Sequence, residues 1–207
     1  MKVPSYMISS YVGRRVITPS QRDVLFHAFS QRMNIIVCGN LGVGKTTFLN
    51  AIANELHHMG GHVALVQNFN EFSFRESAKI HPIFTFNSPI SDFNQALASA
   101  KTGIVINELE AGTSKPLLLA LRRGRKNVHF GLSSCSDADH ALMRFALLSK
   151  TSFNEVPHLI DLVIHIELDS HNNRKIHIKA VDGFDEKTSS FILRDFDSLT
   201  DSIKAAS

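Results

Sequence analysis

The chain has 207 residues, of which 43% are hydrophobic and 20% are charged. These proportions are those of one soluble globular domain and exclude a disordered or fibrous chain. The formal net charge of +3 is compatible with a nucleic-acid partner but does not support one, because the charges are spread along the chain.

Two features of the sequence indicate a cytoplasmic protein. The two cysteines, Cys38 and Cys135, are too few for a disulfide scaffold, and the apolar run around Cys38 predicts a buried reduced thiol. No apolar run is long enough to cross a membrane, and the first residues lack the apolar core of a signal peptide. We therefore expect a cytoplasmic location and no membrane span.

The first clear element is a helix that begins near residue 18. Residues 1–17 form a lead-in without a clear hydrophobic period, so we place the domain at 18–207. Thr18 can cap the helix, Pro19 suits its first position, and Gln21 can complete a capping box.

Strands and helices then alternate along the chain. Apolar runs predict buried strands over 35–38, 62–66, 103–106 and 128–133. Helices are predicted over 46–59, 92–101, 113–123 and 137–149. The run 82–86 is less clear and is interpreted as a further strand. Repeated strand–helix units of this kind predict a parallel sheet with helices on both faces.

The hydrophobic period changes to two near residue 160. Apolar and polar residues alternate over 160–167 and 175–180, and a last apolar run follows at 191–193. We expect turns at 170–173 and at Asp182-Gly183. The prediction for the whole chain is an α/β fold in which a mostly parallel sheet ends in an antiparallel meander.

The strongest motif is Gly39-Asn40-Leu41-Gly42-Val43-Gly44-Lys45-Thr46, which fits the phosphate-loop pattern G-x-x-x-x-G-K-[ST]. It follows an apolar strand and opens a helix, as phosphate binding requires, because backbone N–H groups and the helix N-terminus then converge on the phosphate oxygens. Lys45 can reach the β- and γ-phosphates, and Thr46 can offer its hydroxyl to Mg²⁺. The alternative is an ordinary glycine turn with a solvated lysine.

We therefore predict a nucleotide-binding segment of nine consecutive residues, namely Gly39, Asn40, Leu41, Gly42, Val43, Gly44, Lys45, Thr46 and Thr47. Glu108, just after the strand 103–106, is the expected catalytic carboxylate and, with Thr46, the expected metal-site residue. Glu71 is a second catalytic candidate. The alternative for both glutamates is an ordinary solvated carboxylate.

Two further clusters admit more than one interpretation. His57, His58 and His62 gather at a helix end without a cysteine or carboxylate at ligand spacing, which favours contact with the helix C-terminus over a metal site. The basic residues Arg122, Arg123, Arg125 and Lys126 are interpreted as a solvated helix end, with a nucleotide or nucleic-acid phosphate and a neighbouring subunit as alternatives.

Several segments together resemble the ATPases of type II and type IV secretion systems, and most closely their conjugative-transfer, TrbB-type branch. The segments that carry the resemblance are 17–21, 34–51, 104–108, 141–145 and 182–184. They occur in the same order as in the family, and the resemblance covers roughly residues 18–196. Within this resemblance, Lys45 and Thr46 correspond to the phosphate-loop pair and Glu108 to the Walker B glutamate.

The resemblance implies a RecA-like domain that binds ATP and Mg²⁺. It implies a hexameric ring, or a mixed ring with related subunits, at the cytoplasmic base of a secretion or conjugation machine, and so a peripheral position at the inner membrane. Relatives carry a separate N-terminal domain over the nucleotide, for which the residues before Thr18 do not suffice. We therefore expect a more open site, or one closed by a partner chain.

The sequence departs from the family at several charged positions. Gln67 and Asn68 stand where the acidic Asp box has carboxylates, and only Glu71 keeps one. The segment 133–136 has no histidine where the His box stands, and the arginines near 98–101 and Glu110 are absent. Such groups stabilise charge on a transferring phosphate.

Three functions are therefore weighed. The first is an active secretion or conjugation ATPase. The second is a subunit of such a machine that binds nucleotide but hydrolyses it weakly. The third, less favoured, is a small-molecule kinase.

Overall fold

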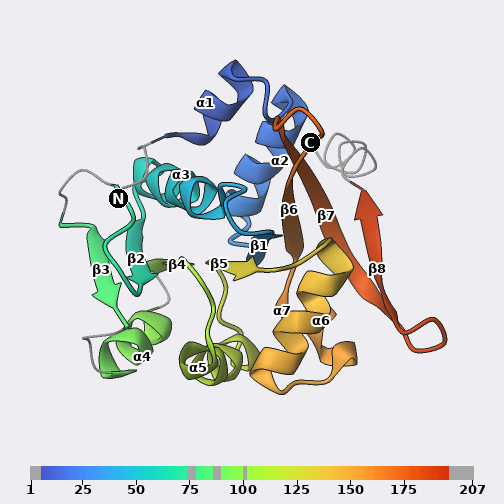
Figure 1. Ribbon diagram of the computed structural model, residues 1–207. Helices are drawn as coiled ribbons and strands as arrows, with labels where there is room; N and C mark the ends of the chain where they lie inside the picture. The colour runs from blue at the N-terminus through green and yellow to red at the C-terminus, as the bar shows by residue number, and fades with distance from the viewer. Residues whose placement is uncertain (1–5, 74–77, 86–89, 100–101, 196–207) are drawn as a thin grey trace.

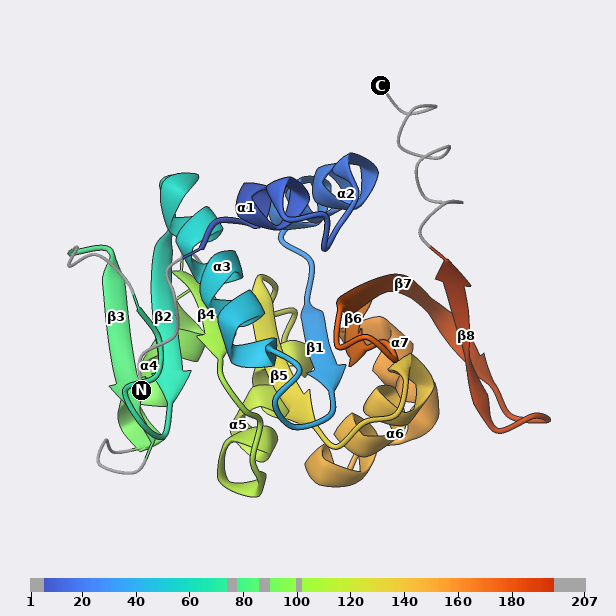
Figure 2. The same cartoon turned by 45° about the horizontal axis from the view of Figure 1, so that its top comes forward.

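The computed structural model describes residues 6–73, 78–85, 90–99 and 102–195, which form one twisted sheet with helices on both faces (Figures 1 and 2). The strands are β1 (Ile35–Gly39), β2 (His62–Gln67), β3 (Ile80–Phe84), β4 (Thr102–Ile106), β5 (Val128–Ser133), β6 (Leu162–Leu168), β7 (Arg174–Asp185) and β8 (Ser190–Asp195). Their order is β3-β2-β4-β5-β1-β6-β7-β8. The first six are parallel, whereas β7 and β8 pair antiparallel, which confirms the predicted fold class.

The helices form two layers on opposite faces of the sheet (Figure 2). One layer holds α1 (Ile8–Gly13), α2 (Pro19–Ser30) and α3 (Lys45–His58), and the other holds α4 (Ile90–Ala98), α5 (Ala111–Arg122), α6 (Ala138–Ser149) and α7 (Val156–Leu159), which follows a 3₁₀ turn (Phe153–Glu155). Successive residues of β1 serve different layers, since Val37 packs with the first and Ile36 with the second. The central strands are therefore buried on both faces.

Asn34 joins three strands where they begin. Its side-chain nitrogen donates to the carbonyl oxygens of Arg125 (3.1 Å) and Leu159 (2.9 Å), and its side-chain oxygen accepts from the Val128 N–H (3.1 Å). Asn34 is 1% exposed, so water cannot replace these bonds. The asparagine thus fixes β1, which carries the phosphate loop, against β5 and the segment leading to β6.

The first helices show one confirmed and one missed prediction. The capping box at the start of α2 is present: the Thr18 hydroxyl accepts from the Gln21 N–H, and the Gln21 side chain accepts from the Thr18 N–H. The lead-in contains the unpredicted helix α1, whose Ile8 and Tyr11 are buried in the core. A six-residue helix is too short to show a hydrophobic period, so the sequence did not reveal it.

The later elements require three corrections. The strand predicted over 82–86 lies two residues earlier, as β3, and Phe86 is outside the described residues. The helix predicted over 92–101 begins at Ile90 and ends at Ala98, and its predicted last residues, 100–101, are also outside. The turn expected at Asp182-Gly183 is a β-bulge inside β7, and the turn lies at 186–189. No helix among the described residues is long and apolar enough to span a bilayer.

Candidate nucleotide-binding site

The loop between β1 and α3 depends on glycines at particular positions. Gly42 and Gly44 have φ values of +79° and +105°, which residues with a Cβ rarely adopt. A Cβ on Gly39 would lie 2.1 Å from the Ile166 carbonyl oxygen, so only glycine lets the loop leave β1 beside β6. Gly44 also precedes the first turn of α3. The loop therefore delivers backbone N–H groups and a helix N-terminus to one point.

Lys45 is the first residue of α3 and folds back over this loop. Its ammonium donates to the carbonyl oxygens of Gly39 (3.2 Å) and Asn40 (2.9 Å), and the residue is 7% exposed. Burial lowers the pKa of the Lys45 ammonium, whereas the nearby Glu108 carboxylate raises it. A buried cation that points into a loop of backbone groups favours binding of an anionic ligand.

A cleft of about 550 Å³ opens at the carboxyl ends of the parallel strands. It is lined by Leu41, Gly42, Gly44, Lys45, Thr46, Asn68, Phe69, Glu71, Asn107, Glu108 and Ser133. The structure thus brings Lys45 and Thr46 together with Glu108 and Glu71, as predicted from three separate segments of sequence. Of the remaining predicted residues, Gly39 and Asn40 hold the lysine, Val43 is buried beneath the loop, and Thr47 lies in the first turn of α3.

Glu108 is held in the cleft by Ser133, the last residue of β5. One carboxylate oxygen accepts from the Ser133 N–H (2.8 Å) and the other from its hydroxyl (2.7 Å). Ser133 begins the segment without a histidine, so a hydroxyl orients the glutamate here. Ser133 was not predicted as a site residue, because its partner Glu108, which follows β4, is separated from it by 25 positions in the chain.

Glu71 is positioned by two amides. Its carboxylate accepts from the Asn107 side chain (2.5 Å). Its N–H and that of Phe72 donate to the side-chain oxygen of Gln67 at 3.0 and 3.1 Å. Gln67 therefore stabilises the turn that carries Glu71, although it supplies no charge. Asn68 forms hydrogen bonds with Glu110 and Thr85 at the same edge of the sheet.

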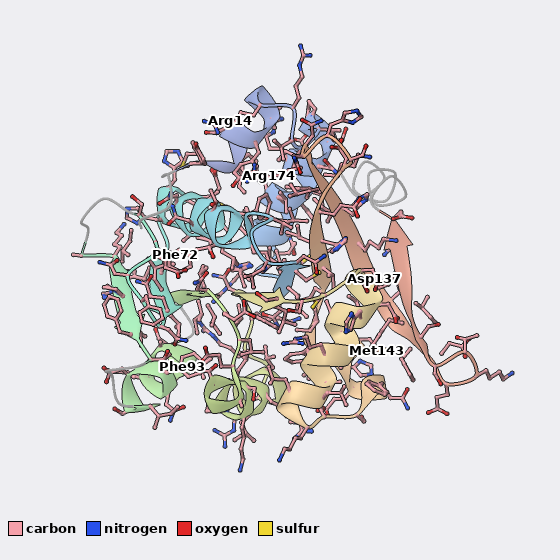
Figure 3. The ribbon with its side chains drawn as sticks, viewed as in Figure 1. Arg14, Phe72, Phe93, Asp137, Met143 and Arg174 are labelled. Atoms are coloured by element: carbon pink, nitrogen blue, oxygen red, sulfur yellow. The ribbon has the colours of Figure 1, made fainter. Side chains whose placement is uncertain are left out.

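Arg174, at the start of β7, is a second cation at the loop and was missed in the sequence. Its Nε donates to the Val43 carbonyl oxygen (2.8 Å), and a Cβ on Gly44 would lie 2.9 Å from the same nitrogen. Figure 3 shows the residue between α3 and the strands β6 and β7. The guanidinium has further N–H groups beyond this bond, so it can brace the loop and also face an anion.

The two clusters left open in the sequence lie away from this cleft. His57 and His58 occupy the last turn of α3, and the described residues contain no group of three metal ligands. The basic cluster lies near the amino end of β5, opposite the phosphate loop, so it does not reach the nucleotide site of its own chain. Both cysteines are buried and free, and burial raises the pKa of the Cys38 thiol.

The arrangement defines a P-loop NTPase: a phosphate loop between a central parallel strand and a helix, with a carboxylate at the end of a nearby strand. Residues 22–204 match the KAP family P-loop domain. The chain belongs to this family.

The chain is also similar to two conjugal transfer proteins. It is 25% identical over 186 residues to conjugal transfer protein TrbB of Rhizobium radiobacter, and 26% identical over 186 residues to the probable conjugal transfer protein TrbB of Sinorhizobium fredii (strain NBRC 101917 / NGR234). Each alignment covers 86% of this chain and 57% of the relative. The resemblance to conjugative-transfer ATPases is thereby confirmed, and the chain spans a little over half the length of these relatives.

Two solved structures share the fold. The VirB11 ATPase of the Brucella suis type IV secretion system, in complex with sulphate, matches with a TM-score of 0.62 and 14% identity, covering 83% of this chain and 61% of that one. The pilus retraction motor PilT with bound ADP matches with a TM-score of 0.60 and 14% identity, covering 90% and 56% respectively. At this identity the likeness shows the fold alone.

Proposed function

We propose that the chain binds ATP with Mg²⁺ in the cleft and forms the RecA-like motor core of a secretion or conjugation machine. The observation that carries the proposal is the meeting of Lys45 and Thr46 with Glu108 and Glu71 in one cleft. The domain boundary at residue 18 stays a prediction, and α1 packs against the same domain.

The donor set fits a magnesium nucleotide. A hydroxyl and two carboxylates are oxygen ligands of the kind that Mg²⁺ takes directly or through water. Lys45 would neutralise the β- and γ-phosphates, Thr46 would hold the metal, and Glu108 would orient a water molecule. When bound, the metal neutralises charge on the phosphates. The residues predicted from the sequence keep these roles as proposals.

The same cleft favours slow hydrolysis. Lys45 is the one cation among its described lining residues, and Arg174 stands behind the loop with its Nε bound to the Val43 carbonyl oxygen. Gln67 and Asn68 form hydrogen bonds but carry no charge, and Ser133 begins the segment where the resembled family has its histidine. Because removing one group that stabilises transition-state charge costs about 10²–10³-fold in rate, we propose a nucleotide-binding subunit that hydrolyses weakly on its own. An arginine from a neighbouring subunit would raise the rate.

Turnover measurements separate the two functions. ATP binding and phosphate release are measured for the native chain and for Glu108→Gln, with Asp139→Asn on α6, a residue that does not line the cleft, as a control. Weak native turnover with firm binding supports the regulatory subunit. Fast native turnover that Glu108→Gln abolishes, with binding retained, supports the active ATPase. If the native chain does not bind ATP, both fail.

Assembly is proposed from the relatives. Their names connect them with conjugal transfer, and the family resemblance implies a hexameric or mixed ring at the cytoplasmic side of the inner membrane. The partners would be proteins of that machinery. Sedimentation of the chain with and without nucleotide tests the ring. A monomer at every concentration would contradict a ring of identical subunits but leave a mixed ring in place.

A further inference from the structure

A groove of about 930 Å³ lies at the end of the sheet opposite the nucleotide cleft. Its lining comes from the end of α2, from α4, and from α5 with the segment that follows it. Helices α4 and α5 lie side by side on one face of the sheet (Figure 1). It is the larger of the two clefts, and the proposed nucleotide chemistry makes no use of it.

The lining is basic. The cations that line the groove are Arg32, Lys115, Arg123, Arg125 and Lys126, and no aspartate or glutamate is among the described lining residues. Arg125 is 8% exposed, and burial together with the adjacent Arg32 lowers the pKa of its guanidinium to about 10. Like charges held this close create a positive potential that an anionic partner would relieve.

The neighbouring cations are largely neutralised or engaged within the chain, which singles out two of them. Arg122 pairs with Glu155 (2.6 Å), and Lys126 pairs with Asp161 (3.0 Å). In the part of the chain that the structure describes, Lys115 and Arg123 form no ion pair or side-chain hydrogen bond. Both side chains are exposed on the groove, so their charges are available to a partner.

The floor between these two charges is apolar. Leu119 lies four residues after Lys115 on α5 and four residues before Arg123, which caps the end of that helix, so the three side chains lie along one face. Leu119 is 43% exposed, and Pro116, Ala120 and the buried Leu97 line the groove with it. The groove therefore offers apolar surface between two cations that have no partner in the described part of the chain.

We propose that this groove binds an acidic amphipathic helix of a partner protein. Lys115 on α5 and Arg123 at the cap of that helix are eight residues apart, about 12 Å along the helix axis, so carboxylates two turns apart on a partner helix match them. Apolar side chains between those carboxylates would cover Leu119. A nucleic-acid strand fits less well, because no aromatic ring for base stacking is among the described lining residues.

A peptide titration tests the proposal. The probe is a fluorescent synthetic helix of about 18 residues, or five turns, with leucines along one face and glutamates two turns apart beside them. Two matched probes replace either the glutamates by glutamine or the leucines by serine. We expect saturable binding of the first probe to the native chain, and binding about tenfold weaker for each of the other two. Failure of the native chain to bind the first probe overturns the proposal.

Charge-reversal variants locate the binding site. Arg123→Glu is compared with Lys187→Glu, which makes the same charge change in the exposed turn between β7 and β8. We expect Arg123→Glu to lower the affinity for the first probe about tenfold. Lys187→Glu should leave that affinity within about twofold of the native value. Equal loss in both variants means non-specific attraction and overturns the proposal. Tighter binding of single-stranded DNA that also depends on Arg123 would assign the groove to nucleic acid instead.

Discussion

The Arg174 guanidinium donates a hydrogen bond to the Val43 carbonyl oxygen at 2.8 Å and so ties the first residue of β7 to the phosphate loop. The two residues are 131 positions apart in the chain. They meet because β6 pairs with β1 and β7 returns antiparallel beside β6. The antiparallel end of the sheet therefore contributes to the shape of a loop that the parallel part carries.

Arg174→Ala is expected to weaken ADP binding about tenfold, because the loop loses a hydrogen bond from a charged donor and the site loses a cation. Titration with a fluorescent ADP analogue measures the effect. Lys175→Ala removes the adjacent positive charge of the same strand without touching the loop and should change affinity by less than about twofold. Equal affinities for native chain and Arg174→Ala would show that the bond does not shape the site.

Some residues of the candidate nucleotide site could be predicted from the sequence and others could not, because only some of them belong to a local sequence pattern. Lys45 and Thr46 belong to one contiguous motif, and Glu108 comes shortly after the apolar run Ile104-Val105-Ile106, so a local pattern suffices. Arg174 and Ser133 carry no such pattern. Their roles depend on strand order, which brings distant segments to one edge of the sheet.

Helices and strands were predicted where the sequence carries a clear local signal, either a capping motif or an apolar pattern. The capping box of α2 and the buried strands follow that rule. Helix α1 is too short for a period, and Asp182-Gly183 has a turn composition although the chain continues through it as a bulge. At that bulge, the antiparallel pairing of β7 with β8 overrides the turn preference of the two residues.

Asn34→Ala is expected to lower the free energy of unfolding by about 2–4 kcal/mol. The substitution removes three side-chain hydrogen bonds and leaves the buried Val128 N–H and two carbonyl groups without their partner. Urea unfolding followed by circular dichroism gives the value. Asn154→Ala removes an exposed hydrogen bond to Glu186 and should cost less than about 1 kcal/mol. A similar loss for both variants would contradict the bridging role of Asn34.

The burial of His129 predicts that the free energy of unfolding falls at acidic pH. This β5 residue is fully buried against Phe29, and burial lowers its pKa from 6.5 to about 3. Between these values the unfolded chain binds a proton that the folded chain excludes, so stability falls as the pH falls. The slope rises from about half of 1.4 kcal/mol per pH unit at pH 6.5, where the unfolded imidazole is half protonated, toward that full value at lower pH, which gives a loss of about 1.5 kcal/mol from pH 6.5 to pH 5.

His129→Leu isolates this contribution. Other groups titrate in the same range, so the quantity to compare is the difference in unfolding free energy between native chain and variant at each pH. We expect that difference to shift in favour of the variant by about 1.5 kcal/mol as the pH falls from 6.5 to 5. A difference independent of pH would mean that His129 is protonated equally in both states.

The most direct test of the nucleotide site is equilibrium binding of ATP, in the presence of Mg²⁺, to the native chain and to Lys45→Ala. The Lys45 ammonium is buried and points into the loop, so its removal should abolish a large electrostatic attraction between the protein and the phosphates of ATP. We expect saturable binding to the native chain and an affinity about a hundredfold lower in the variant. Equal affinity in both, with both chains folded, would contradict this expectation.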